Sequence, residues 1–385
     1  MRTYEETHPW ITFRWEPRRI PYPVWLLLGE AGARITQVGA CSMPPEAGQR
    51  IARKALVQSL DALAAMEGNT LTTDQVEHCL DGRLQLPASQ AYLGQEVQNL
   101  FQAFRWTHDR LVAGDRQLTP WSIQLLNAQV LKGLPWEDGS SPGEYRTVRQ
   151  PNAVAGVPVE DIGYLVERTC DWLVADRFAP EHAEEHHAFG LVRAFLAQLY
   201  LLWVRPFGDG NERTAWLVTH QLLLEADVPA IVSQRLIAHI GRSRKAWWRE
   251  IASAATGHGD PVPFLAFMAR ALNEASRELV HEVQQDQDQV MFSNHLQAIL
   301  QADRTANGAR RSALVQTLAE QPQAVPPGRL LHLTPVMARL YARLDRKTLT
   351  RDIAHLEEVG LLVRTPSGVS AKQAPLRAFA PLRPA

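Results

Sequence analysis

The sequence predicts a mainly α-helical protein with a separate small domain in its C-terminal part. Three observations support this prediction. Apolar residues recur at helical spacing through most of the 385 residues. Short clusters of Gly and Pro separate these patterns. The character of the sequence changes after the proline-rich stretch Gln321–Gly328. A chain of this length can form two or three domains with a sizeable core.

The overall composition is that of an ordinary globular chain. Hydrophobic residues make up 45% and charged residues 21% of the sequence, and the formal net charge is −1. Such a charge gives no reason to expect that the whole chain binds nucleic acid or a membrane surface. Apolar runs such as Phe195–Val204 are too short to cross a bilayer, and the polar segment Met1–Glu6 does not resemble a signal peptide.

The chain has three cysteines that are far apart in the sequence: Cys41, Cys79 and Cys170. No C-x-x-C pair occurs and the number is odd, so we expect neither a disulfide scaffold nor a structural zinc site. We therefore expect a protein of the reducing cytoplasm that makes no contact with a membrane.

Helical patterns follow one another along the chain. We expect helices at Tyr22–Thr36, Glu46–Met66, Tyr92–Arg110, Pro120–Leu131, Val157–Val174, Leu191–Val204, Thr214–Leu224, Gln234–Ser253, Pro261–Ala271 and Ala271–Leu300. Gly68 should end the second helix, and Thr72 should cap a short helix after it. The Glu- and His-rich stretch 181–187 has no H-E-x-x-H spacing, so it favours a solvated helix start over a metal site.

The most informative stretch is Val204–Trp216, with the sequence V-R-P-F-G-D-G-N-E-R-T-A-W, between two apolar helices. Pro206 should end the first helix at the preceding residue. Gly208 and Gly210 permit a tight turn. Asp209 or Asn211 could cap the next helix, whose free N–H groups and dipole attract an anion. The stretch therefore predicts a helix–loop–helix with a phosphate cradle.

This stretch resembles the signature of Fic (Fido-fold) proteins, His-Pro-Phe-x-(Asp/Glu)-Gly-Asn-Gly-Arg-x-x-Arg. Six residues match the signature: Pro206, Phe207, Asp209, Gly210, Asn211 and Arg213. Three residues differ: Arg205 replaces the histidine, Glu212 the second glycine and Trp216 the last arginine. The resemblance implies a Fic helical core with a small β-hairpin flap. It also implies transfer of AMP from ATP, with Mg²⁺, to a hydroxyl group of a target protein.

The resemblance assigns roles to the loop. In the family, the histidine accepts the proton of the attacking hydroxyl, and the acidic residue, here Asp209, holds Mg²⁺. Asn211 and the backbone amides bind the α-phosphate, and the arginines bind the other phosphates. The implied catalytic positions are thus Arg205, Asp209, Asn211 and Arg213. The implied nucleotide-binding positions are Gly208, Gly210, Asn211, Glu212, Arg213 and Trp216.

The three replacements argue against this chemistry. Arg205 stays protonated and cannot be a general base, whose loss usually costs about 10²–10⁴ in rate. Glu212 puts a negative charge where phosphates should bind, and it can form a capping box with Asp209 that occupies two amides of the cradle. Trp216 cannot neutralise a γ-phosphate, although it could stack on a base.

Two other segments resemble functional parts of the family. Glu67 and Gly68 resemble the end of the inhibitory helix, (Ser/Thr)-x-x-x-Glu-(Gly/Asn), whose glutamate pairs with the last signature arginine. Here that arginine is Trp216, and Arg213 could take its place as a partner. The stretch Pro142–Gly156 resembles the flap hairpin, in which Tyr145, Arg146 and Thr147 would hold a segment of the target protein by strand addition.

The C-terminal part resembles a winged helix. Helices are expected at Thr334–Leu344 and Arg346–Val359, and strands at Gly360–Arg364 and Leu376–Phe379. Residues 334–383 contain nine Lys or Arg and four Asp or Glu, a local excess of positive charge that favours DNA contact slightly over protein docking. The candidate DNA-binding residues are Arg346, Lys347, Thr350 and Arg351.

These features predict four regions: an N-terminal helical region (1–110), a Fic-like core (111–275), a connecting helix and linker (276–328) and a winged helix (329–385). The leading interpretation is a pseudoenzyme without standard AMP transfer that acts as a binding or regulatory module. One alternative is an active transferase that uses a different nucleotide donor, with Asp209 or Glu67 as the base. The other is a transcription regulator. A homodimer is a further expectation from the resemblance.

Overall fold

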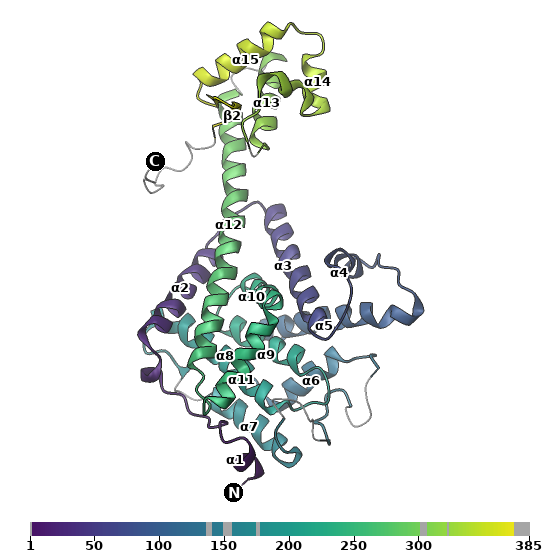
Figure 1. The fold of residues 1–385 in the computed structure, drawn as a ribbon, viewed down its shortest axis with the longest axis vertical. Coiled ribbons are helices and arrows are strands. Elements are labelled where there is room, and N and C mark those ends of the chain that lie inside the picture. Colours follow the sequence, from purple (N-terminus) through teal and green to yellow (C-terminus); the bar gives the residue numbers. More distant parts are fainter. Residues whose placement is uncertain are drawn as a thin grey trace. The chain divides into compact units, whose positions relative to one another are not determined.

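The computed structural model describes residues 2–135, 141–148, 156–174, 178–300, 306–321 and 323–372. Nearly all of its regular structure is helical, and the sheet in the described residues has two strands (Figure 1). The mainly α prediction is therefore confirmed. The chain divides into two compact units, unit 1 (Met1–His281) and unit 2 (Glu282–Ala385), with the boundary inside a long helix.

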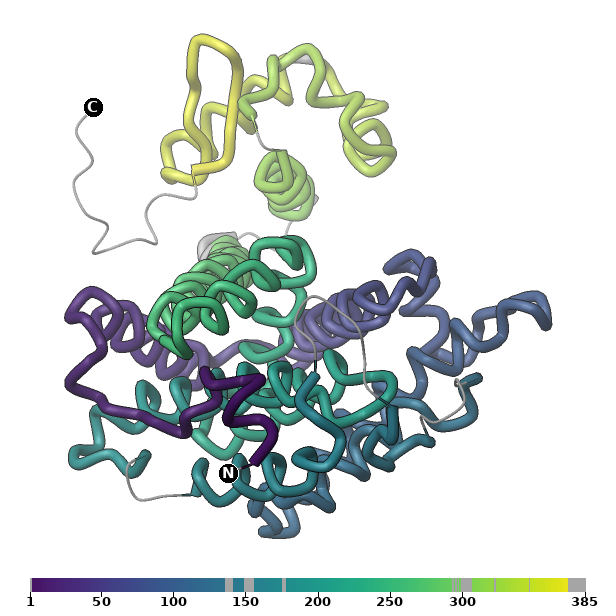
Figure 2. The backbone as a smooth tube through the Cα atoms, turned by 60° about the horizontal axis from the view of Figure 1, so that its bottom comes forward, coloured from purple at the N-terminus to yellow at the C-terminus, as the bar shows by residue number. Residues whose placement is uncertain are grey.

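Unit 1 is a helical bundle. Its helices are α1 (Thr3–Thr7), α2 (Tyr22–Gly39), α3 (Pro45–Met66), α4 (Thr73–Leu80), α5 (Ala91–Val112), α6 (Pro120–Val130), α7 (Ile162–Leu173), α8 (His186–Val204), α9 (Asn211–Glu225), α10 (Ala230–Arg242), α11 (Arg244–Thr256) and the first part of α12 (Val262–Leu300). Short 3₁₀ turns occur at Pro17–Arg19, Ala88–Gln90, Val159–Asp161 and Ala183–Glu185. The segment before α2 runs across one side of the bundle (Figure 2), and Ile11, Phe13 and Trp15 are buried there.

Most expected helix ends agree with the structure within a few residues, but two expectations were wrong. Two helices, α10 and α11, occupy the range Gln234–Ser253 where one helix was expected. They are separate because the backbone at Ser243 leaves the helical region (φ −122°, ψ 25°). The two expected helices at Pro261–Ala271 and Ala271–Leu300 form the single helix α12. No Gly or Pro follows Pro263 before Leu300, so nothing in the sequence breaks this helix.

Helices α8 and α9 lie at the centre of unit 1 and pack against each other (Figure 1). Every residue of α9 from Asn211 to Leu223 is buried. The segment Ala183–Val204 is long and apolar enough to cross a membrane by length and composition, and so exceeds the apolar run seen in the sequence, but 72% of the tested stretch is buried in the bundle. Its central position in the bundle accounts for its apolar composition.

The described residues of unit 2 form the last part of α12, three short helices, a 3₁₀ turn and a hairpin. The elements are α13 (Ala306–Ala319), a 3₁₀ turn at Pro327–His332, α14 (Pro335–Tyr341), α15 (Arg346–Glu358), β1 (Leu362–Thr365) and β2 (Gly368–Ala371). The strands pair antiparallel, and Val325 bridges to Val369. The expected second strand at Leu376–Phe379 lies outside the described residues, and the strand that pairs with β1 is β2 instead. The winged-helix assignment stays a prediction.

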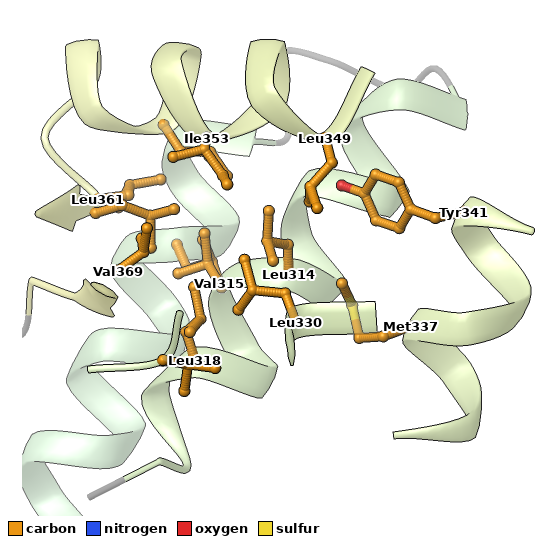
Figure 3. Packing of buried hydrophobic residues seen from close by; sticks show 14 of the residues in the cluster. Leu314, Val315, Leu318, Leu330, Met337, Tyr341, Leu349, Ile353, Leu361 and Val369 are labelled. Carbon is orange, nitrogen blue, oxygen red and sulfur yellow. The ribbon is translucent and has the colours of Figure 1, made fainter. Parts of the chain in front are cut away.

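Apolar side chains from α13, α14, α15 and the hairpin form the core of unit 2 (Figure 3). The carboxylate of Asp352 is buried among these helices. Both oxygens of Asp352 accept hydrogen bonds: from Arg310 Nε (2.7 Å), Arg311 Nε (2.9 Å) and Tyr341 Oη (2.9 Å). Because these partners come from α13 and α14, the carboxylate fixes the position of α15. The opposite side of α15 is left exposed, including Lys347, Thr350 and Arg351.

Candidate functional site

The loop between α8 and α9 has the predicted helix–loop–helix form. Helix α8 ends at Val204, and Arg205 adopts the left-handed region (φ 45°) while its N–H donates to the carbonyl of Leu201 at 2.9 Å. Gly210 also has a positive φ (71°), and a Cβ there would lie 3.1 Å from the side-chain nitrogen of Asn127. Gly208 does not have a positive φ, so only the second of the two glycines meets the expectation of an unusual backbone.

Two asparagine side chains hold this loop in place. The Asn211 side chain accepts the N–H of Phe207 (3.0 Å) and donates to the carbonyl of the same residue (2.7 Å). The side-chain nitrogen of Asn127, in α6, donates to the carbonyl of Asp209 (2.9 Å) and to Thr214 Oγ1 (3.2 Å). The predicted phosphate ligand Asn211 is thus engaged within the loop. Asn127 was not predicted, although it is a polar residue in a mostly apolar helix.

The predicted capping box between Asp209 and Glu212 is wrong. The N-cap of α9 is Gly210, so Glu212 is the second helical residue and not the third, which the capping box requires. The Glu212 carboxylate instead forms a two-pronged ion pair with Arg244 of α11, with the shortest nitrogen–oxygen distance at 2.8 Å. Asp209 Oδ1 accepts the N–H of Gly210 at 2.5 Å.

The guanidinium of Arg213 is enclosed by carboxylates. Arg213 is only 2% exposed, and it donates through Nη1 to Glu96 and through Nη2 to Asp209 (3.4 Å). Its Nε lies 3.7 Å from Glu67. The second oxygen of Glu96 accepts from the side chain of Asn69 at 2.8 Å. The guanidinium that was expected to bind a phosphate is therefore already surrounded by carboxylates of the protein.

Glu96 is another site residue that the sequence analysis missed. It lies on the buried side of α5, where apolar neighbours such as Leu93, Val97 and Leu100 mark the core face. A charged residue on such a face is rarely buried without a partner. That signal was available in the sequence, but the identity of the partner, 117 positions away, was not.

Glu67 and Gly68 end α3 as the resemblance implies. Helix α3 ends at Met66, Glu67 is its C-cap, and Gly68 has a φ of 91°. Glu67 lies 3.7 Å from Nε of Arg213, the residue that the sequence offered as its partner in place of the missing arginine. Asp209 also lies close to Arg213, whereas Glu212 pairs with Arg244.

Burial raises the pKa of the Glu67 carboxyl to about 7. The positive charge of Arg213 opposes the shift, whereas the negative charges of Glu212, Asp209 and Glu96 add to it. The folded protein should therefore hold more protons at this carboxyl than the unfolded chain between the ordinary pKa of 4.5 and about 7.

This proton uptake predicts a pH dependence of stability. Because the folded state binds the additional proton, the stability from Glu67 should be largest at low pH and should fall as the pH rises through this window. The variant Glu67→Gln should lack this fall in stability with rising pH. Thermal unfolding midpoints of both proteins, measured from about pH 4.5 to 8, test this, with the exposed Glu46→Gln as control. Parallel profiles for wild type and Glu67→Gln would contradict the prediction.

Trp216 was expected to contact a nucleotide, and the structure corrects this. Its side chain is only 1% exposed and stacks on Trp247 of α11, with ring centroids 5.5 Å apart and an interplanar angle of 29°. The indole nitrogen of Trp247 donates to Gln198 at 3.2 Å. Trp216 is therefore a core residue. The small void beneath the loop, lined by Pro206, Phe207 and neighbouring helix residues, leaves no space for a water molecule.

Arg146 was expected to face a target peptide, but it is a buried anchor. It is 1% exposed and donates to three carbonyls: Arg205 (2.8 Å), Val148 (3.1 Å) and Val157 (2.5 Å). Burial lowers the pKa of its guanidinium to about 10, and the nearby charge of Arg205 adds to this shift. Its backbone N–H also donates to the carbonyl of Pro206 at 2.9 Å. Arg146 thus fixes the base of the expected flap to the signature loop.

The expected flap itself is described only in part. Tyr145 packs against Phe207, with ring centroids 5.9 Å apart, and Thr147 is exposed. Residues 141–148 contain no strand. The remainder of the expected hairpin, residues 149–155, lies outside the described residues, so binding of a target segment by strand addition stays a prediction.

Residues 117–223, which contain α6, α7, α8 and most of α9, match the family model of the Fic/DOC family. The chain therefore contains a Fic domain. Its relatives include the protein adenylyltransferase Fic of Nematostella vectensis, 25% identical over 246 residues, and that of Drosophila willistoni, 27% identical over 245 residues. Both alignments cover 63% of this chain but only 52% and 45% of the relatives, so the chain spans about half their length.

Solved structures show the same fold as this Fic protein. A Fic family protein from Desulfovibrio desulfuricans G20 has a TM-score of 0.56 and 21% identity, with 96% of each chain covered. Fic-1 from C. elegans has a TM-score of 0.56 and 20% identity, with 68% of this chain and 73% of the other covered. At such low identity the likeness shows the fold and not the activity.

The structure brings part of the predicted Fic site together. Asp209, Asn211, Arg213 and Glu67 lie around the signature loop, whereas Trp216 belongs to the core behind it. The predicted DNA-binding residues are in unit 2, where Lys347, Thr350 and Arg351 are exposed and the side chain of Arg346 lies outside the described part of the chain.

Proposed function

We propose that this chain is a Fic-domain pseudoenzyme, which has lost standard AMP transfer and acts as a binding or regulatory module. The observation that supports this proposal is that the Arg213 guanidinium is already engaged by carboxylates of the protein. The guanidinium that should bind phosphate is buried and paired with Glu96, with Asp209 and Glu67 beside it. A phosphate would have to displace these carboxylates, which repel it.

The other signature positions support the same conclusion. Arg205 has no lone pair with which to accept a proton. Glu212 holds a negative charge at the start of α9, where the free N–H groups of the helix would bind an anion, and Arg244 fixes it there. Trp216 is committed to the core. Each part of the family chemistry would need a residue that here does something else.

The residues also fit Mg²⁺ and ATP poorly. Mg²⁺ in nucleotide sites is usually held by one or two carboxylates together with substrate phosphates. The candidate carboxylate, Asp209, already accepts the N–H of Gly210 and lies beside Arg213, and the Arg213 guanidinium is taken by Glu96. We therefore assign no catalytic step to a metal or nucleotide in this site.

Nucleotide binding by calorimetry tests the proposal. Wild type titrated with ATP, CTP, UTP or GTP, each with Mg²⁺, should give no binding heat. Glu212→Gly removes a negative charge from the cradle and releases Arg244, so measurable binding of at least one nucleotide should appear. The exposed Glu77→Gly on α4 is the control and should bind none.

Tight binding of one nucleotide by wild type would contradict the pseudoenzyme. It would favour the alternative, a transferase with a different donor, and the search for the transferred group would follow. Ready transfer of AMP to a protein by wild type would have the same consequence.

Unit 2 supports a second candidate function, that of a DNA-binding regulator. Four cations of α14, α15 and their connection are exposed and make no ion pair with any described residue: Arg339, Arg343, Lys347 and Arg351. The acidic Asp352, by contrast, is directed into the core. An exposed row of unpaired cations on successive helices is the electrostatic pattern of a phosphate-contacting surface.

Salt-dependent DNA binding tests this second candidate. Affinity for duplex DNA should fall steeply with salt, and Arg351→Ala should weaken binding and reduce the slope of log K against log salt by about one. The matched control is Arg277→Ala, an exposed arginine of unit 1, which should leave the slope unchanged. Absence of salt-dependent binding, or equal slopes in all three proteins, would favour protein docking.

A further inference from the structure

A groove separate from the signature loop lies within unit 1, between α2 and the segment 179–189 that leads into α8. Two cavities, of about 870 Å³ and about 680 Å³, share four lining residues: Gly29, Glu181, Glu184 and Ala188. Because they share these residues, the cavities are neighbouring parts of one groove. Each has the volume of a typical ligand site.

One end of the groove is aromatic. Trp15, Trp25 and Phe189 line it, and the rings of Trp25 and Phe189 lie 5.6 Å apart at 32°. Trp25 belongs to α2. On this helix Tyr22 is 73% and Leu26 54% exposed, so apolar surface continues beyond the cavity. Helical positions three and four apart face the same way, which places this surface and the groove on one side of α2.

The rim of the groove is acidic. Arg18 is the only Lys or Arg among the residues that line the two cavities. Five carboxylates line them: Glu16, Glu181, Glu184, Glu185 and Asp227. Some of them have internal roles, since Asp227 pairs with His186 (3.1 Å) and Glu185 accepts the N–H of Glu181 (3.1 Å). The carboxylates of Glu181 and Glu184 are exposed and form no ion pair with the described residues.

The floor of the groove is formed by small residues. Gly29, Gly32 and Ala33 of α2 line the cavities, and a Cβ added at Gly29 would meet no atom within 4 Å. A partner could therefore approach the backbone of α2 closely. A metal ion is a poor candidate for the groove, because the described residues contain no group of three His, Cys, Asp or Glu side chains placed to hold one.

We propose that this groove binds a peptide segment of a partner protein that carries basic and apolar side chains. The exposed carboxylates Glu181 and Glu184 would accept charge-assisted hydrogen bonds from Arg or Lys. Trp25 and Phe189 would receive an alkyl or guanidinium group, by apolar contact or by cation–π attraction. The small residues of α2 would let the peptide backbone lie close to the helix. Charge complementarity thus selects a basic segment over an acidic one.

Fluorescence anisotropy with two labelled peptides tests the proposal on the full chain. One short peptide alternates arginine with leucine, and the other alternates glutamate with leucine. The basic peptide should bind and the acidic one should not. The double variant Glu181→Gln/Glu184→Gln should weaken binding about tenfold or more. Gly29→Leu should do the same by filling the groove, since leucine is also a better helix former than glycine and should not impair folding.

A charge-matched control separates the groove from general attraction to acidic surface. Glu46→Gln/Glu77→Gln removes two exposed carboxylates elsewhere in unit 1 and should leave binding unchanged. Equal loss in both double variants, no effect of Gly29→Leu, or no binding of the basic peptide would overturn the proposal. Self-association of the wild type that Gly29→Leu abolishes, without peptide binding, would also overturn it and would assign the groove to contact between copies of the chain.

Discussion

Replacing Trp216 by arginine, the residue that the family signature has there, should destabilise unit 1 by about 4–5 kcal/mol and should not restore a phosphate site. The side chain is 1% exposed and stacks on Trp247, so the substitution removes a large aromatic contact and buries a charge. The indole nitrogen of Trp216 is buried and has no hydrogen-bond partner among the described residues, so the site offers no group that holds a polar side chain. An unpaired buried charge costs far more than the loss of packing alone.

Urea unfolding of the full chain, followed by circular dichroism, measures this effect. Trp216→Phe keeps most of the apolar volume and should be considerably milder than Trp216→Arg. Trp121→Arg is the matched control, because Trp121 is 63% exposed and its replacement should be close to neutral. A stable Trp216→Arg protein that binds a nucleotide would refute the assignment of this position to the core.

The second large effect is expected at Glu96. Glu96→Gln keeps the shape of the side chain but removes the charge that pairs with buried Arg213, which should cost about 3–5 kcal/mol of stability near neutral pH. Asp209 and Glu67 lie farther from the guanidinium, at 3.4 and 3.7 Å, so they should compensate only in part. The exposed Glu77→Gln is the control and should change stability little.

A double-mutant cycle identifies the cause. Arg213→Met alone leaves Glu96 buried without its cation and should be similarly costly. The double variant Glu96→Gln/Arg213→Met removes both charges and should cost clearly less than the sum of the single variants. Additive costs would show that the two side chains do not depend on each other, and would weaken the argument that Arg213 is held for structure and not for phosphate.

These two predictions concern the same property of the molecule. The side chains of the signature loop are used for packing and for ion pairs within the protein. Arg244 with Glu212 and Trp247 with Trp216 show that the replacements have partners in α11. Two of the three replacements are thus matched by a neighbouring side chain, which supports a binding role over a damaged enzyme.

The local sequence was sufficient for the helix ends next to the loop and for one of its two predicted glycine positions. Pro206 ends α8, Gly210 provides the positive φ, and Gly68 ends α3, because these residues restrict or release the backbone wherever they occur. The helical periodicity of apolar residues likewise located most helices. Residue chemistry also excluded Arg205 as a general base without any coordinates.

Two of the charge pairs at the site, Glu212 with Arg244 and Arg213 with Glu96, were decided by the tertiary structure alone. Glu212 was expected to turn back to Asp209, but the N-cap of α9 is Gly210, and α11 places Arg244 where it forms a two-pronged ion pair with Glu212. Arg213 meets Glu96 from a helix more than a hundred positions away. Local spacing determines what a backbone can do, whereas a buried charge takes whichever opposite charge the packing of distant helices brings to it, and no local pattern contains that information.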